Sequence, residues 1–241
     1  MRLFTAEGRF LTDPTESVAA VWIQENDHLM AIAQEVKLAA TQQAFALWCC
    51  GGSKIITWGD PACGGESSQV QHQLRNVQQV QATNHAFAAI LADGSVVAWG
   101  MADAGGDSSQ VQHQLRNVQQ VLATYHAFAA ILADRSVVTW GMADADGDSS
   151  QVQHQLRNAQ QVLATYHAFA VILADRSVVT WGMADADGDS SQVQRQLRDV
   201  QQMQVTHFAF AAILADGSVV TWGMADAGGD SSEAQDQLAH L

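Results

Sequence analysis

Basic residues, cysteine and long apolar runs are scarce in this chain, and each shortage excludes a class of protein. Only 11 Lys and Arg face 25 Asp and Glu, so the formal net charge is -14. Nucleic acid and anionic membranes both bind through a basic footprint, so we expect neither as a partner. Three cysteines, Cys49, Cys50 and Cys63, are too few and too badly spaced for a disulfide framework. Together with a start, MRLFTAEGRFL, that lacks signal-peptide features, they favour a reducing compartment, the cytoplasm or the nucleus.

What the chain does contain is a tandem repeat. Trp-Gly pairs recur at a constant spacing of 41 residues, so no insertion separates one tryptophan from the next. A fixed period of this size is typical of solenoids and propellers. We therefore expect five units, with tryptophans at Trp58, Trp99, Trp140, Trp181 and Trp222.

Each unit contains a strong β-hairpin signal. AFAAILA, residues 86–92, and SVVAW, residues 95–99, flank Asp93-Gly94. A two-residue type I′ turn at this point would set Leu91 against Val96 and Ala88 against Trp99. Both faces of the hairpin would then be apolar, so it has to lie between neighbouring sheets. In two units the turn reads Asp-Arg, and because a left-handed arginine costs about 1–2 kcal/mol we expect a different turn type there.

A third strand fits at about 77–83, and the linker at 100–117 is rich in Gly and Asp before a short helical turn. Ser109 and Gln112 have capping-box spacing in that turn. The sequence thus predicts an all-β fold, a β-propeller-like array of about five three-stranded blades with short helical turns in the linkers. Its structural core is expected at the five tryptophans and at Phe87, Phe128, Phe169 and Phe210.

The segment VQATNHAFAAILADGSVVAWG resembles the repeat of the regulator of chromosome condensation family. That repeat reads roughly Gly-x-x-His, an apolar strand, a Gly turn, and a strand that ends in Trp-Gly. The resemblance covers residues 36–241, with His85, His126 and His167 at the family's histidine position and Gln43 and Phe208 in its place in the outer units. It implies a propeller, commonly of seven blades, such as also occurs in HECT-type ubiquitin ligases. The family's nucleotide-exchange activity relies on an inserted wedge, for which the strict spacing leaves no room.

The N-terminal segment LFTAEGRFLTDPTESVAAVWIQENDHLMAIA resembles the C-terminal half of a ubiquitin-like domain. Ile23-Gln24 and residues 29–32 fit that pattern, whereas the first hairpin and the helix of such a domain are missing. The alternative is a degenerate first blade. The expected domains are therefore 1–35, a partial ubiquitin-like segment or degenerate blade, and 36–241, the repeat propeller.

Acidic linkers offer the strongest metal signal. Alternating aspartates can surround Ca²⁺, as in the first half of an EF-hand loop. Ser149 and Gln155 stand where such a loop needs Gly and a bidentate Glu, so a solvated acidic loop is the favoured interpretation. The weak calcium candidates are Asp144, Asp146, Asp148, Asp185, Asp187 and Asp189.

Other polar residues favour structure over chemistry. His72, His113 and His154 recur once per unit and are interpreted as surface residues, and Cys49-Cys50 as buried thiols without a CxxC spacing. The serine pairs serve better as helix caps than as nucleophiles. Residues that break the repeat compose no catalytic set, so we expect no enzyme and no cofactor.

These observations predict a non-catalytic protein–protein interaction scaffold, in one form an adaptor or a fragment of a ubiquitin-ligase-type protein. Its acidic loops favour a protein partner with a basic surface. An open ring would expose strand edges and tend to self-associate. The alternatives are a guanine-nucleotide exchange regulator of a small GTPase and a calcium-binding repeat protein.

Overall fold

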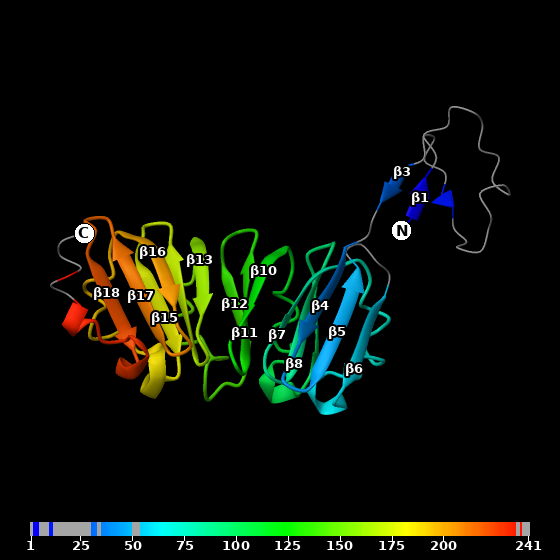
Figure 1. Cartoon of the computed structure of the whole chain (residues 1–241), viewed down its shortest axis with the longest axis horizontal. Helices are drawn as coiled ribbons and strands as arrows, with labels where there is room; N and C mark the ends of the chain where they lie inside the picture. Colours follow the sequence, from blue (N-terminus) through cyan, green and yellow to red (C-terminus); the bar gives the residue numbers. More distant parts are fainter. Residues whose placement is uncertain are drawn as a thin grey trace. The chain divides into compact units, whose positions relative to one another are not determined.

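The computed structural model describes residues 2–4, 10–11, 30–32, 35–49, 54–234 and 237. The chain divides into two compact units, Met1–Lys37 and Leu38–Leu241 (Figure 1). None of the helices in the described ranges is long and apolar enough to cross a membrane.

The first unit holds a small antiparallel sheet. Its strands are β1 (Arg2–Phe4), β2 (Phe10–Leu11) and β3 (Met30–Ile32), in the order β2-β1-β3. Every sheet of the second unit has its strands in sequence order, so the first unit does not repeat the blade pattern. The Ile23-Gln24 motif lies outside the described residues.

Five three-stranded antiparallel sheets form the second unit, one for each repeat, which confirms the predicted all-β propeller-like array. We call them blades 1 to 5 in chain order. Blade 1 is β4 (Val36–Ala40), β5 (Ala44–Cys49) and β6 (Ile55–Gly59); blade 2 is β7 (Val77–Ala82), β8 (Ala86–Leu91) and β9 (Val96–Gly100); blade 3 is β10 (Val118–Ala123), β11 (Ala127–Leu132) and β12 (Val137–Gly141); blade 4 is β13 (Ala159–Ala164), β14 (Ala168–Leu173) and β15 (Val178–Gly182); blade 5 is β16 (Val200–Val205), β17 (Ala209–Leu214) and β18 (Val219–Gly223).

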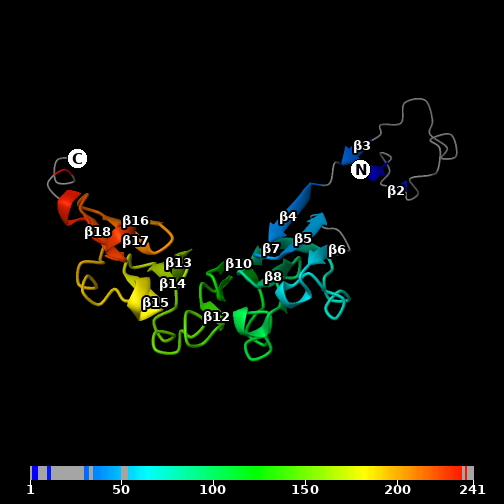
Figure 2. The ribbon, with the colours of Figure 1, turned by 60° about the horizontal axis from the view of Figure 1, so that its bottom comes forward.

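Within the second unit the blades stand side by side in a curved row. The first strands of blades 2 to 5 contact one another along the row. Figure 2 shows these strands, β7, β10, β13 and β16, along the concave side. The turns that follow them are therefore brought together from repeats far apart in the sequence.

Apolar side chains fill the space between consecutive blades. Phe87 and Trp99 stack with ring centroids 5.1 Å apart, and both pack against Trp48 and Ile55 of the preceding blade. Blades 3, 4 and 5 repeat the same Phe–Trp stack against the blade before them. Both faces of an internal hairpin are thus covered, as its apolar pattern predicts.

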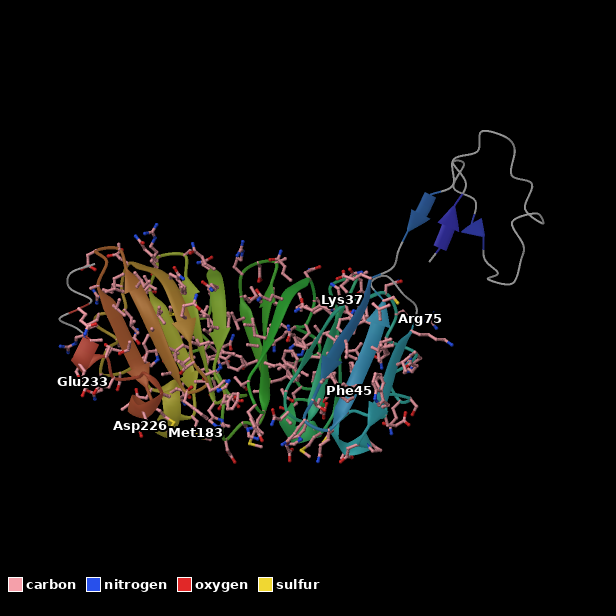
Figure 3. The ribbon with its side chains drawn as sticks, viewed as in Figure 1. Lys37, Phe45, Arg75, Met183, Asp226 and Glu233 are labelled. Atoms are coloured by element: carbon pink, nitrogen blue, oxygen red, sulfur yellow. The ribbon has the colours of Figure 1, made fainter. Side chains whose placement is uncertain are left out.

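Trp58 is an exception to the predicted core. Its side chain is 44% exposed, and Phe45, on which it stacks, is 42% exposed (Figure 3 labels Phe45 on β5). Within the described part of the second unit no sheet lies against this face of blade 1, because blade 1 is the first of the row. The prediction of Trp58 as core is therefore wrong, whereas the other eight predicted aromatic residues are buried.

The hairpin register differs by one residue from the predicted one. Phe87 pairs with Trp99 and Ile90 with Val96, so the two large rings lie on the same face. The loop is longer than two residues: Gly94 N donates to Leu91 O, and the Asp93 carboxylate accepts hydrogen bonds from Ser95 N and Oγ. Such a loop needs a left-handed backbone at one position only, here residue 94.

One turn type consequently serves all four internal hairpins that share this sequence. Arg135 and Arg176 take φ values of 67° and 64°, close to the 77° of Gly94. Arg135 N also donates to Leu132 O, as Gly94 N does to Leu91 O. The expectation of a different turn type for Asp-Arg is wrong. A three-residue loop needs a left-handed backbone at one position only, and Arg135 and Arg176 adopt it there.

Short helical turns occupy the start of the linkers. They are η2 (Pro61–Cys63), η3 (Ala102–Ala104), η5 (Ala225–Ala227) and η6 (Ser232–Ala234), which are 3₁₀ helices, and η4 (Ala184–Gly188), a π-helical turn. The predicted capping pair acts differently: Asp107 accepts from Ser109 N, while Gln112 Nε2 donates to Val96 O of the outer strand. Gln71, Gln153 and Gln194 donate in the same way, so this bond holds the linkers of blades 1 to 4 against their own blades.

Candidate interaction site

The turn between the first and middle strands of each blade is built around a threonine. Thr83 Oγ1 accepts a hydrogen bond from Ala86 N at 3.0 Å and donates to Ala86 O. Thr124 and Thr165 make the same contacts three residues along. Threonine favours this local arrangement because its hydroxyl satisfies backbone groups that a strand ladder leaves free. We call residues 83–86, 124–127, 165–168 and 206–209 the inner turns.

Backbone hydrogen bonds connect the inner turns across the blades. Asn84 N donates to Tyr125 O at 3.1 Å, Tyr125 N to Tyr166 O at 2.9 Å, and Tyr166 N to His207 O at 2.9 Å. Each bond joins residues of neighbouring blades. The ladder holds one side chain from each of blades 2 to 5 in a row along the concave side.

That side chain differs in almost every blade. Asn84, Tyr125, Tyr166 and His207 occupy one position of the repeat, between a threonine that is constant and an alanine two residues later that is also constant. Sequence analysis did not single them out. The sequence does show that this position varies between two invariant ones. Only the fold shows that it lies on an accessible surface.

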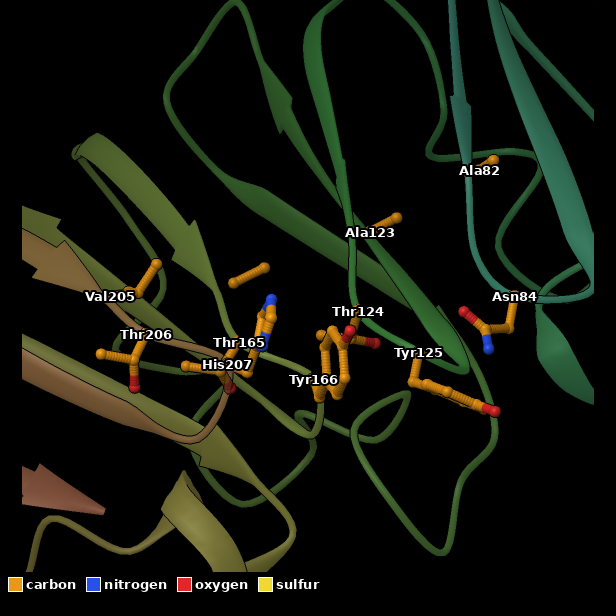
Figure 4. A pocket seen from close by; sticks show the side chains of 11 residues that line it. Ala82, Asn84, Ala123, Thr124, Tyr125, Thr165, Tyr166, Val205, Thr206 and His207 are labelled. Atoms are coloured by element: carbon orange, nitrogen blue, oxygen red, sulfur yellow. The ribbon is translucent and has the colours of Figure 1, made fainter. Parts of the chain in front are cut away.

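An open concavity of about 510 Å³ lies over these residues (Figure 4). Its lining includes Asn84, Tyr125, Tyr166 and His207, together with three of the four inner-turn threonines, Thr124, Thr165 and Thr206. Among the described residues that line it there is no Lys, Arg, Asp or Glu. The surface is therefore aromatic and hydroxylic rather than charged.

Aromatic rings contact one another along the row. Tyr166 stacks on His207 with ring centroids 4.5 Å apart, and Tyr125 meets Tyr166 edge to face at 5.9 Å. Tyr125 also lies 4.5 Å from the ring of His126. Tyr166 remains 39% exposed. The rings thus form a connected, partly exposed surface, and their mutual contacts limit the rotamers that each side chain can adopt.

Two buried carboxylates lie in the linkers beside this surface. Asp146 and Asp187 stand where the linkers of blades 1, 2 and 5 have glycine, and both are 0% exposed. In blade 2 that glycine, Gly105, has φ 93°, and a Cβ there would come within 2.6 Å of the Phe128 ring. Aspartate cannot take this conformation, so its linkers fold differently, as the π-helical turn η4 shows.

The altered linkers leave buried polar atoms without partners. Trp99 Nε1 donates to Gly64 O, and Trp140 Nε1 to Gly105 O, both at 3.0 Å. Trp181 and Trp222, whose acceptors would come from residues 146 and 187, have no hydrogen-bond partner among the described residues. The same part of the chain also offers no hydrogen-bond partner to the carboxylate oxygens of Asp146 and Asp187 or to Nδ1 of His126 and His167.

Burial is the main cause of the pKa shifts of Asp146, Asp187 and His126. It raises the pKa of Asp146 to about 6, against the opposing effects of the Thr124 hydroxyl and His167. Burial also raises the pKa of Asp187, which Thr165 and His167 oppose. The pKa of His126 is lowered, first by burial and then by His167 and His85. Thr124 and Thr165, whose hydroxyls lower the pKa of Asp146 and Asp187, also line the concavity, so each carboxylate neighbours one of its lining residues.

The other candidate residues lie apart from this surface. Asp144, Asp148 and Asp189 are exposed, whereas Asp146 and Asp187 point inward, and the side chain of Asp185 lies outside the described residues. In the described ranges no group of three or more His, Cys, Asp or Glu could hold a metal ion. The exposed residues include His72, His113 and His154; Cys49 is half-buried, Cys63 is buried, and Cys50 lies outside the described residues.

Comparison with known proteins identifies the fold alone. No protein-family model and no curated protein matches the chain. A structure of yeast RCC1 (Prp20) bound by Kap60 has a TM-score of 0.53 at 14% identity over 79% of this chain and 56% of that chain. A second, of Prp20p from Saccharomyces cerevisiae, has a TM-score of 0.49 at 14% identity over 79% and 58%. The chain thus spans a little over half the length of these proteins.

The comparisons do not support a ubiquitin-like segment in residues 1–35 or a HECT-type ligase context. The repeat region of this chain therefore has the fold of an RCC1-like propeller.

Proposed function

We propose that the chain is a non-catalytic protein-interaction scaffold and that the inner turns make the contact. The observation that carries this proposal is the backbone ladder, which holds Asn84, Tyr125, Tyr166 and His207 in a row over a concavity. Tyrosine is enriched at protein interfaces because it offers a large contact area with few rotatable bonds. A rigid frame with one variable position per repeat suits recognition.

Binding suits this surface better than catalysis. The hydroxyls of Thr124 and Thr165 already bond backbone groups of their own turns, so they are not free nucleophiles. Prp20, whose fold this chain shares, is bound by Kap60 in one structure, and its binding to Gsp1p and histones is the subject of another. Those partners belong to that protein, but they support protein binding as a use of the fold. We place the scaffold in the cytoplasm or the nucleus, as the cysteine content suggests.

A capture experiment tests the proposal. The tagged full-length chain is cross-linked in its source cells, and its partners are compared with those of Tyr125→Ala/Tyr166→Ala. The matched control is Met101→Ala/Met224→Ala, which removes two side chains of 40% and 44% exposure from the linkers. We expect the inner-turn variant to lose its specific partners by about tenfold or more, as hot-spot residues do, and the control to keep them.

Two results would overturn this function. Partners that are lost with the methionine variant but kept with the tyrosine variant would move the interface to the linkers. Catalytic acceleration of nucleotide release from a small GTPase by the purified chain would replace the scaffold with an exchange regulator.

A further inference from the structure

We propose that the inner turns bind their partner through an arginine side chain, which lies against the rings of Tyr125, Tyr166 and His207 in front of Asp146 and Asp187. The inference rests on the proposed function, because it names the partner chemistry of the same surface. Three features of the structure lead to it: the buried charge, the lack of a cation that neutralises it, and the shape of the aromatic row.

The charge lies just behind the surface. Asp146 and Asp187 are fully buried, and the threonines beside them form part of the concavity. A carboxylate in a poorly solvated position acts on its surroundings more strongly than one in water, because less solvent screens it. Low-dielectric walls also focus the field into a cleft. The concavity therefore attracts a cation although no carboxylate lines it.

Among the described residues no Lys or Arg forms an ion pair with these carboxylates. The ion pair found among the described residues joins Lys37 and Glu35 and involves neither Asp146 nor Asp187. The groups that face Asp146 are Thr124, His167 and Asp187, and those that face Asp187 are Thr165 and His167. Burial, followed by the neighbouring His167 and His85, lowers the pKa of His126. The negative charge is left for a partner to compensate.

The aromatic row favours arginine over lysine. A guanidinium is planar, is more weakly hydrated than an ammonium group, and stacks on aromatic faces. Tyr125 and Tyr166 meet edge to face, so their faces point in different directions and a flat cation can stack on the face of one of them. Asn84 and the tyrosine hydroxyls offer acceptors to its N–H groups. A lysine ammonium can also approach a ring face, but it is more strongly hydrated and cannot stack flat on it.

The test measures hexa-arginine and hexa-lysine binding to the full-length chain at low salt by calorimetry. We expect the wild type to bind hexa-arginine about fivefold more tightly than hexa-lysine, the ratio that one exposed cation–π contact provides. Tyr125→Ala/Tyr166→Ala should bind the two peptides equally. Asp146→Gly/Asp187→Gly should weaken both, while Asp103→Asn/Asp226→Asn, which removes two carboxylates from the linkers of blades 2 and 5, should weaken binding less.

Several outcomes would overturn the inference. They are equal affinities of the wild type for the two peptides, an unchanged arginine preference in the tyrosine variant, and equal losses in the two aspartate variants. Should a variant fail to fold, the wild type alone decides: hexa-arginine must shift the aromatic NMR signals of residues 125, 166 and 207 more than those of the exposed His72 and His113. A partner that depends on the inner turns in the capture experiment, with no arginine preference here, would leave the scaffold standing and remove only this inference.

Discussion

The indole Nε1 of Trp140 donates a 3.0 Å hydrogen bond to the carbonyl oxygen of Gly105 in the linker of the preceding blade. This bond connects two repeats at the outer side of their shared core. In the next blade Asp146 replaces the glycine, and Trp181 has no hydrogen-bond partner in the described part of the chain. One residue change in a linker thus alters the polar contacts of an entire blade boundary.

Replacing these two tryptophans by phenylalanine should cost different amounts of stability. Trp140→Phe and Trp181→Phe remove the same volume from equivalent, 5% exposed positions. Trp140→Phe also breaks a buried hydrogen bond, whereas Trp181→Phe removes a donor that has no acceptor. We expect the free energy of unfolding to fall further in Trp140→Phe, by about 1–3 kcal/mol. Urea denaturation measures the difference, and equal losses would contradict the account.

Asp146 should make the stability of the chain depend on pH. Its pKa is raised from 3.8 to about 6 in the folded state, so the folded protein binds the proton more tightly than the unfolded chain does. The free energy of unfolding from this group is therefore greatest at low pH and is lost as the pH rises through the folded pKa. Between pH 5 and pH 7.5 the loss is about 1.4 kcal/mol.

Asp146→Gly is the variant that isolates this effect, because it restores the linker sequence of blade 2. We expect it to stabilise the chain at pH 7.5 and to remove that part of the pH dependence. Asp144→Asn, at an exposed position two residues earlier, should change neither. An Asp146→Gly variant with the pH profile of the wild type would show that the carboxylate is not buried in solution.

The hairpin loops allow a test of backbone strain. Arg176 and Gly217 occupy the same loop position, with φ values of 64° and 86°, and a Cβ at residue 217 would meet nothing within 4 Å. Arg176→Gly should raise the free energy of unfolding, and Gly217→Ala should lower it, each by about 1 kcal/mol. Thermal denaturation of the two variants checks the pair of signs. A gain in stability from Gly217→Ala would exclude the left-handed loop.

Trp58 and Trp99 share one place in the repeat but not one environment. Trp99 is 4% exposed between two blades, whereas Trp58 is 44% exposed on blade 1. Trp99→Ala should cost about 3–5 kcal/mol, as truncation of a buried aromatic residue does, and Trp58→Ala much less. Comparable losses in denaturation experiments on this chain would mean that the outer face of blade 1 is covered in solution.

The repeat period and the apolar strands were enough to predict the number of blades and their three strands. They could do so because each unit carries its own hairpin signal, and because two apolar faces demand a neighbour on each side. The exact register was not predictable from the Asp93-Gly94 pair alone. That pair suits a two-residue loop as well as a three-residue loop, and the Ser95 contacts that decide between them form only in the folded turn.

The inner turns and the buried carboxylates could not be predicted from the sequence for a different reason. Asn84 and Tyr125 are 41 residues apart, and only the ladder between blades places them side by side. Asp146 lies among alternating aspartates that resemble a solvated loop, and nothing in that pattern distinguishes it from the exposed Asp144 and Asp148. The sequence shows where each of these residues lies in the repeat, but it does not show which side chains surround that residue in the fold.

The most direct test of the interaction surface is photo-cross-linking in the source cells. A benzoylphenylalanine placed at position 166, on the inner turns, is compared with one at position 113, on the exposed part of a linker. We expect a discrete cross-linked partner from position 166 and none from position 113. A partner captured from position 113 alone would contradict it, because the contact would then be made by the linkers and not by the row of Tyr125, Tyr166 and His207.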